Sequence, residues 1–225
     1  MRTIHLAAFA MGLLALSVAH VAAETSPILN NVEVQKLVKS GTLADNARLA
    51  AHFTALADES TADAKRHEAM STGFGSNLGR QLGANMSAHC NRLAALNRQA
   101  ATTLGELATH HTKLAAGVSS IVPANAAAYQ SGKGARVPTD DDLRALAAKA
   151  NRPADHRALM EYFNEVAKRH TRTANEHQQM AMSYRGTRIP SAAVRCDRMV
   201  TISRDSAKEA TAAATMHKDL AGVSR

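Results

Sequence analysis

The stretch HFTALADESTADAKRHEAM (residues 52–70) decides the fold, because the chain contains it twice in altered form. A shift of 110 residues places it on YFNEVAKRHTRTANEHQQM (residues 162–180). The matches fall on distinctive residue types: His67 meets His177, and each stretch ends in methionine. Chance similarity between two alanine-rich helices is the alternative. The pattern favours an internal duplication.

The two cysteines of the chain stand in a second pair of matching stretches, SAHCNRLAALNRQ (residues 87–99) and AVRCDRMVTISRD (residues 193–205). A shift of 106 residues aligns Cys90 with Cys196, and a histidine follows 21 residues later in each copy. The change of shift corresponds to a difference of four residues in one loop. Each half of the chain therefore has the same order of chemical groups along two consecutive helices.

The composition and the apolar spacing indicate helices throughout. Alanine is abundant, aromatic residues make up 3% of the chain and there are five prolines. Apolar residues recur every three to four positions over four long segments, 43–72, 85–117, 153–184 and 192–220, with short helices expected at VEVQKLVKS and at 139–150. We therefore predict an all-α fold. It is an up-down-up-down four-helix bundle made of two duplicated helical hairpins, each preceded by a short helix.

The start of the chain indicates export. The first 23 residues carry an early arginine, an apolar run too short to span a membrane and small residues before Glu24, as in a secretory signal peptide. We expect a periplasmic or secreted protein with no membrane span. The rest divides into a first hairpin repeat (24–117), a linker (118–138) and a second hairpin repeat (139–225), which form one bundle domain.

The charge and the motifs restrict the possible functions. The net charge is +8, which favours acidic surfaces, but the basic residues are scattered and few aromatic side chains could stack on bases. We therefore expect no nucleic-acid binding, and a partner that is a protein or a component of the cell envelope. The chain has no phosphate-binding glycine loop and no G-x-S-x-G or H-E-x-x-H motif, so we expect no enzymatic activity.

The cysteines are expected to form a disulfide. In an up-down-up-down bundle both hairpin loops lie at the same end, and Cys90 and Cys196 each follow their loop by five or six residues. Both sulfurs would then lie at one level of the core. A disulfide in an oxidising compartment would close a loop of about a hundred residues and stabilise the fold by about 4 kcal/mol.

The alternative is a metal site, because two histidines and two methionines are expected in the same layer. Thiolate, thioether and imidazole together suit a soft ion, copper first and zinc second. Hydrogen-bonded core histidines and packing methionines would give the same pattern. The candidate metal ligands are His67, Cys90, His177, Cys196, Met70 and Met180. A second candidate cluster, expected at the opposite end, is His111, His217, His52 and His156.

The motifs HEAM, HQQMA, HCNRL and HTKLA resemble those of uncharacterised exported helical proteins with paired H-x-x-M and H-C-x-x-L hairpins. The resemblance covers residues 50–115 and 160–222. This chain departs from it at Arg195, which replaces histidine before the second cysteine, and where leucine replaces methionine after the histidine of each HTKL-type motif. The resemblance implies the helical fold and the same positions of interest, and it implies no particular activity.

Three functions follow from the sequence. The preferred one is a non-enzymatic exported bundle of structural, stress or interaction type. The second is a periplasmic protein that binds copper or zinc through the duplicated His/Cys/Met layer. The third is a carrier of haem or of a small molecule in the bundle core, without covalent haem attachment because the chain has no C-x-x-C-H motif.

Overall fold

The computed structural model describes residues 27–77, 80–116, 138–187 and 189–222, and this part of the chain is helical apart from its turns. It forms six helices: α1 (Asn31–Ser40), α2 (Leu43–Ser76), α3 (Arg80–Leu114), α4 (Asp140–Lys149), α5 (Pro153–Arg185) and α6 (Pro190–Leu220). The all-α class and the short helix before each long pair are confirmed. The predicted signal peptide (1–23) and all but the last residue of the predicted linker (118–138) lie outside the described residues.

Local sequence sets the start of five helices. Asn30, Thr42 and Thr139 each accept a hydrogen bond from the backbone N–H three residues on, where an acidic side chain accepts one in return. These reciprocal bonds are capping boxes. α5 and α6 instead have Pro153 and Pro190 in the first turn, where the missing N–H of proline costs nothing.

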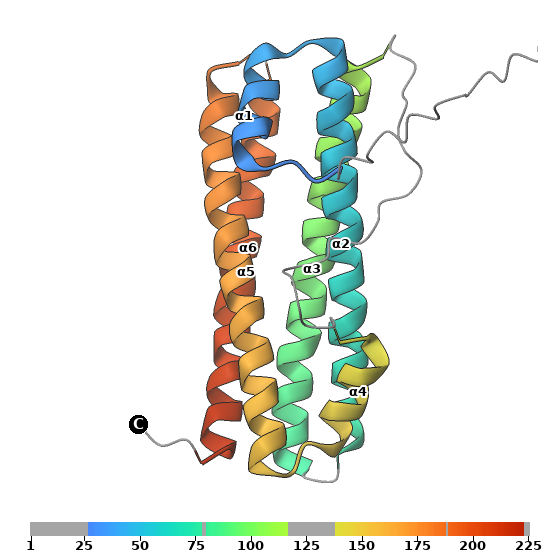
Figure 1. Ribbon diagram of the computed structural model, residues 1–225, viewed down its shortest axis with the longest axis vertical. Coiled ribbons are helices and arrows are strands. Elements are labelled where there is room, and N and C mark those ends of the chain that lie inside the picture. Colours follow the sequence, from blue (N-terminus) through green and yellow to red (C-terminus); the bar gives the residue numbers. More distant parts are fainter. Residues whose placement is uncertain (1–26, 78–79, 117–137, 188, 223–225) are drawn as a thin grey trace, which may run out of the picture.

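The four long helices form a bundle in which α2 pairs with α3 and α5 pairs with α6 (Figure 1). α3 also packs along α6, whereas the described parts of α2 and α5 do not approach within 8 Å between Cα atoms. The short helices lie on this more open side. α1 contacts α2 and α5 near one end of the bundle, and α4 contacts the same two helices near the other end. We name these ends the α1 end and the α4 end.

The directions of the helices differ from the predicted order. His111, near the end of α3, contacts Asn46 at the start of α2 and Tyr184 at the end of α5. α3 and α5 therefore run parallel, and the four long helices follow a down-up-up-down order. The predicted up-down-up-down order is wrong.

The connection between the two hairpins explains the difference. α3 ends at the α1 end whereas α4 lies toward the α4 end, so the two helices that this connection joins stand at opposite ends of the bundle. α5 has 33 residues and is about 50 Å long, and the 21 residues of the connection (117–137) can reach up to about 70 Å. The two hairpin turns consequently lie at opposite ends of the bundle, and the two halves of the chain run in opposite senses.

The hydrophobic core has one buried cluster toward each end. The α1-end cluster includes Phe53, Tyr184 and Cys196, and the α4-end cluster includes Phe163 and Cys90. Alanine supplies many of the other buried positions, which lets the helices approach closely. None of the described helices is both long and apolar enough to cross a membrane.

Gly73 allows α4 to pack closely on α2. A Cβ atom at this position would lie 2.5 Å from the carbonyl oxygen of Arg144 and 2.9 Å from the Cβ of Ala147. The sequence predicted that α2 ends just before this glycine, but the helix continues to Ser76. Gly73 therefore serves helix packing and does not end the helix.

Candidate functional site

The two cysteines lie in different halves of the core. Cys90 on α3 belongs to the α4-end cluster and Cys196 on α6 belongs to the α1-end cluster, and both are buried with free thiols. α3 and α6 are neighbours that run in opposite directions, which separates the two residues by on the order of 25 Å along the bundle. The predicted disulfide is wrong, because it required both hairpin turns at the same end.

The same reversal divides the predicted metal site. Among the described residues, no three histidine, cysteine or acidic side chains lie close enough together to hold a metal ion. The six predicted ligands form one set toward the α4 end and one toward the α1 end: His67, Met70 and Cys90, and His177, Met180 and Cys196. The prediction of a single copper or zinc site built from all six residues is therefore wrong.

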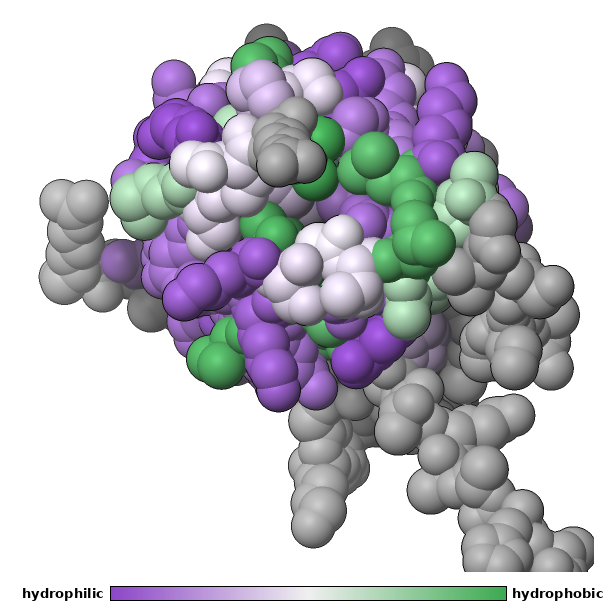
Figure 2. All heavy atoms as spheres, turned by 90° about the horizontal axis from the view of Figure 1, so that it is seen from above, coloured by the Kyte–Doolittle hydropathy of each residue, from purple (hydrophilic) through white to green (hydrophobic). Residues whose placement is uncertain are grey.

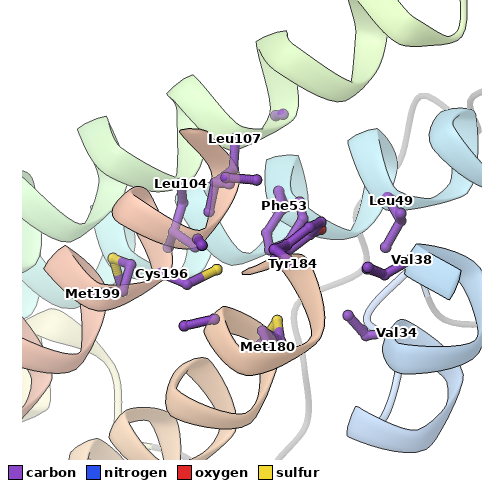
Figure 3. Packing of buried hydrophobic residues seen from close by; sticks show 14 of the residues in the cluster. Val34, Val38, Leu49, Phe53, Leu104, Leu107, Met180, Tyr184, Cys196 and Met199 are labelled. Carbon is purple, nitrogen blue, oxygen red and sulfur yellow. The ribbon is translucent and has the colours of Figure 1, made fainter. Parts of the chain in front are cut away.

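Burial controls the chemistry of both thiols. It raises the pKa of Cys196 to about 12 and also raises the pKa of Cys90, where the charge of Glu209 acts in the same direction. Figure 3 shows Cys196 beside Tyr184 and Met180 in the α1-end cluster. Both thiols stay protonated at neutral pH and pack as small apolar groups.

His111 is fully hydrogen-bonded at the α1 end. Its Nδ1 lies 2.8 Å from Oδ1 of Asn46, and its Nε2 lies 2.8 Å from the hydroxyl of Tyr184. Because an amide oxygen only accepts, Nδ1 donates to Asn46 and Nε2 accepts from the hydroxyl. Phe53 stacks on the ring, with centroids 5.6 Å apart. The two hydrogen bonds join α2, α3 and α5, which explains this histidine as a structural residue.

His217 has different partners at the α4 end. Its ring stacks on Phe163, with centroids 5.7 Å apart, and lies 5.6 Å from the ring of Phe74. Its Nδ1 lies 3.1 Å from Nδ1 of His156, and its Nε2 is buried with no hydrogen-bond partner. This histidine therefore keeps the stacking seen at the other end, but only one of its two nitrogens is satisfied.

The two histidine clusters correspond position by position. The shifts of 110 and 106 residues found in the sequence relate the two hydrogen-bond partners and the stacking phenylalanine of His111 to three residues that surround His217. The corresponding pairs are Asn46 and His156, Phe53 and Phe163, Tyr184 and Phe74, and His111 and His217. The α4 end thus has a second imidazole where the α1 end has an amide, and a phenyl ring where the α1 end has a phenol.

The predicted second cluster is consequently two clusters. His52 lies with His111 at the α1 end, where its ring contacts Phe53 at 5.0 Å. His156 lies with His217 at the α4 end, with ring centroids 5.3 Å apart. The prediction of a single cluster of all four histidines at one end is wrong, because the two halves run in opposite senses.

Six buried histidines are neutral at physiological pH, because burial opposes their protonation. The pKa is lowered to about 4 in two of them, His52 and His111. It is lowered to about 3 in the other four, His67, His170, His177 and His217. In His67 neither ring nitrogen has a hydrogen-bond partner. These imidazoles carry no charge into the core, and several of them leave a buried polar atom unpaired.

Reasoning from the sequence missed Tyr184 and Asp63. Tyr184 could have been found, because the shift of 110 residues, continued beyond residue 180, aligns it with Phe74. Asp63 is buried and forms ion pairs with Arg66 and with Arg169, the latter at 2.6 Å, which links α2 to α5. An acidic residue within a helix normally indicates an exposed face, so no pattern in the sequence could reveal this buried ion pair.

The exposed large hydrophobic residues gather toward the α1 end. Among the residues whose side chains the structure describes, five are of this kind: Val32, Leu43, Leu114, Met182 and Val194. All five lie on the helix segments that meet at this end. Figure 2 looks onto the same end and shows hydrophobic residues set among hydrophilic ones. We name these five residues the apolar end.

A cavity of about 410 Å³ opens between α4 and α5. Its lining is mainly apolar and contains no histidine, so it offers no imidazole ligand for a haem iron. The lining residues are Pro138, Asp142, Leu143, Leu146, Ala158 and Tyr162. The carrier function considered from the sequence gains no support from this cavity.

The histidine clusters and the apolar end are the features of this chain from which a function can be inferred. The resemblance of the hairpins to exported helical proteins stays an expectation. Models of known protein families, curated proteins and solved structures were compared with the chain, and none of them matches it.

Proposed function

We propose that the protein is an exported, non-enzymatic helical bundle that binds another protein through its apolar end. The distribution of the exposed hydrophobic residues carries this proposal, because all five lie toward one end. Val32 is 75% exposed and Val194 is 67% exposed. Exposed apolar side chains concentrated at one end of a molecule are typical of interaction surfaces, where their burial is favourable.

The charges near the apolar end indicate the charge of the surface on the partner. Lys39, Arg48, Lys113 and Arg198 are exposed on the same helix segments, and the whole chain has a net charge of +8. Basic residues at the rim of an interface favour a partner with opposite charges and speed its approach. We therefore expect a partner with an apolar patch and an acidic rim.

The state of the buried groups supports a role without catalysis. Nucleophilic catalysis needs an activated thiolate or hydroxyl, whereas burial keeps both thiols protonated. General acid–base catalysis works best with a pKa near the operating pH, and the six buried histidines titrate at about 3 to 4.

Site-specific photo-crosslinking in the exporting cell tests the proposal. A photoreactive amino acid is placed at Leu43 or Val194 at the apolar end, and at Lys149 or Thr215 toward the α4 end as matched exposed controls. We expect one partner protein to be captured from both apolar-end positions and from neither control. Mass spectrometry of the crosslinked band identifies it.

Charge substitutions then separate a specific surface from chance encounters. The double variant Leu43→Glu, Val194→Glu keeps its fold, because both side chains are exposed, and we expect it to lose capture from a probe at Met182. Equal capture from both ends, or capture that survives the double variant, contradicts the proposal. Crosslinks only between copies of the chain also contradict it, because they would make the apolar end a surface for self-association.

A further inference from the structure

We propose that His156 and His217 form a binding site for a copper or zinc ion at the α4 end of the bundle. The site is independent of the apolar end, which lies at the opposite end of the molecule. It also differs from the six-ligand layer expected from the sequence, since it uses no sulfur and needs no convergence of the two halves' cysteines.

The separation of the two nitrogens fits a shared ion. Nδ1 of His156 on α5 lies 3.1 Å from Nδ1 of His217 on α6. Two imidazole nitrogens at zinc–nitrogen distances of about 2.0–2.1 Å in a tetrahedral arrangement are separated by roughly 3.3 Å. The pair is therefore already spaced as two ligands of one ion, and the hairpin of α5 and α6 holds it there.

The protonation of the two rings allows both Nδ1 atoms to bind one ion while each ring stays neutral. A hydrogen bond between the two Nδ1 atoms needs one donor and one acceptor, which two neutral imidazoles supply, and neutral imidazole is the form that binds metals. Without an ion, one Nδ1–H donates to the other Nδ1. When the ion takes the place of that hydrogen, the displaced proton moves to Nε2 of the same ring, and both Nδ1 lone pairs then face the ion.

The other half of the chain provides an internal comparison. At the α1 end the same arrangement uses Asn46 and Tyr184, and both nitrogens of the buried histidine are hydrogen-bonded. At the α4 end the corresponding residues leave Nε2 of His217 buried and unpaired, which is unfavourable by about 1–3 kcal/mol. A purely structural role is better served by the first arrangement. The arrangement at the α4 end instead places a second imidazole, that of His156, beside the buried histidine.

The surroundings determine which ion the site takes and how tightly. No third histidine, cysteine or acidic ligand stands close enough among the described residues, so water completes the coordination. His156 is only partly buried, which leaves a route from solvent. The neighbouring Asp155 is held by Arg152 at 2.8 Å. Imidazole ligands suit zinc and copper, and Cu²⁺ binds most tightly to a nitrogen site of given geometry.

A metal titration of the mature, untagged and metal-free protein tests the site. Cu²⁺ is added and followed by electron paramagnetic resonance, and Zn²⁺ binding is measured by calorimetry. We expect one ion per chain, with hyperfine splitting from two imidazole nitrogens. The variant His156→Asn reproduces the amide found at the α1 end and keeps a hydrogen bond to His217. We expect it to lower the affinity for both ions at least about tenfold.

A matched control separates this site from other surface histidines. His110→Asn removes a partly exposed histidine from the α1 end, and we expect it to leave affinity and stoichiometry unchanged. Urea unfolding establishes that both variants are folded. Wild-type affinity in His156→Asn, a signal from a single nitrogen, or no binding by the wild-type protein overturns the proposal. None of these outcomes bears on the apolar end, so the two proposals fail separately.

Discussion

At the scale of single residues, the partners of a buried histidine decide what it can do. His111 and His217 occupy corresponding places, and each stacks on a phenylalanine of its own half. Asn46 and Tyr184 satisfy both nitrogens of His111, whereas one nitrogen of His217 has no partner. The first histidine is thereby fixed as a link between helices, and the second keeps a polar group that can change partner.

Exchanging the ring at the two corresponding positions tests this difference. Tyr184→Phe removes the hydroxyl that donates to His111, and we expect it to lower the free energy of unfolding by about 1–3 kcal/mol. Phe74→Tyr introduces a hydroxyl beside the unpaired Nε2 of His217, and we expect a gain of about 1 kcal/mol. Urea unfolding followed by circular dichroism measures both. Changes of the same sign in the two variants would refute this account of the clusters.

The two thiols make a second prediction at this scale. Cys90 and Cys196 are fully buried, and burial raises the pKa of each. A disulfide reagent such as DTNB attacks through the thiolate, so we expect negligible reaction in the folded protein and two reactive thiols per chain in urea. Rapid reaction of either thiol without denaturant would show that the core opens far more easily than its packing indicates.

At the scale of elements, most helices follow from local signals. Apolar spacing and capping residues predict where α1, α4 and α5 begin, because these signals act within one or two turns. The end of α2 could not be predicted in the same way. Gly73 suggested a helix end, but its hydrogen atom faces α4, and a contact between segments so far apart in the sequence leaves no local trace.

The contact between α2 and α4 can be tested with a pair of alanine substitutions. Gly73→Ala forces a methyl group against the backbone of α4, and we expect it to lower the free energy of unfolding by about 1–3 kcal/mol. Gly75→Ala lies two residues further along α2 with nothing within 4 Å of the added Cβ, and we expect a gain of about 0.5–1 kcal/mol from helix propensity. Thermal unfolding of the two variants measures the contrast. A loss of stability in both variants would show that the end of α2 tolerates no alanine, and that the contact with α4 is not the cause.

At the scale of the whole molecule, the sequence predicted a bundle but not its order. A connection of 21 residues can either turn back beside α3 or return along the bundle, and its composition does not distinguish these paths. The predicted disulfide and the predicted six-ligand site depended on the first path. The error in topology therefore divided both candidate sites between the two ends, although the six predicted metal ligands are all buried in the core.

The buried histidines make the whole bundle sensitive to acid. Their pKa values of about 3 to 4 in the folded protein compare with about 6.5 in an unfolded chain. Below pH 6.5 the unfolded chain binds protons that the folded chain does not. Stability is therefore complete above about pH 6.5 and falls with decreasing pH, by about 8 kcal/mol per pH unit when all six titrate. We expect cooperative unfolding near about pH 5, measured by far-ultraviolet circular dichroism.

The variant His177→Gln provides the control for this prediction. Glutamine stays neutral at every pH, so we expect the acid midpoint to move to lower pH, even though stability at pH 8 changes for other reasons. An unchanged midpoint, or wild-type unfolding only below about pH 3, would show that protonation of carboxylates, and not of the buried histidines, causes the unfolding in acid.

The opposite senses of the two halves have a further consequence for how the core can be built. Each histidine cluster takes residues from both halves, so a single half could complete neither of them, whereas two identical halves related by a twofold axis would complete both at once. Two copies of one hairpin, associated through a twofold axis, could therefore build the same core as this single chain. The two clusters of such a dimer would be identical, whereas the two clusters of this protein differ in the hydrogen bonds of their buried histidines.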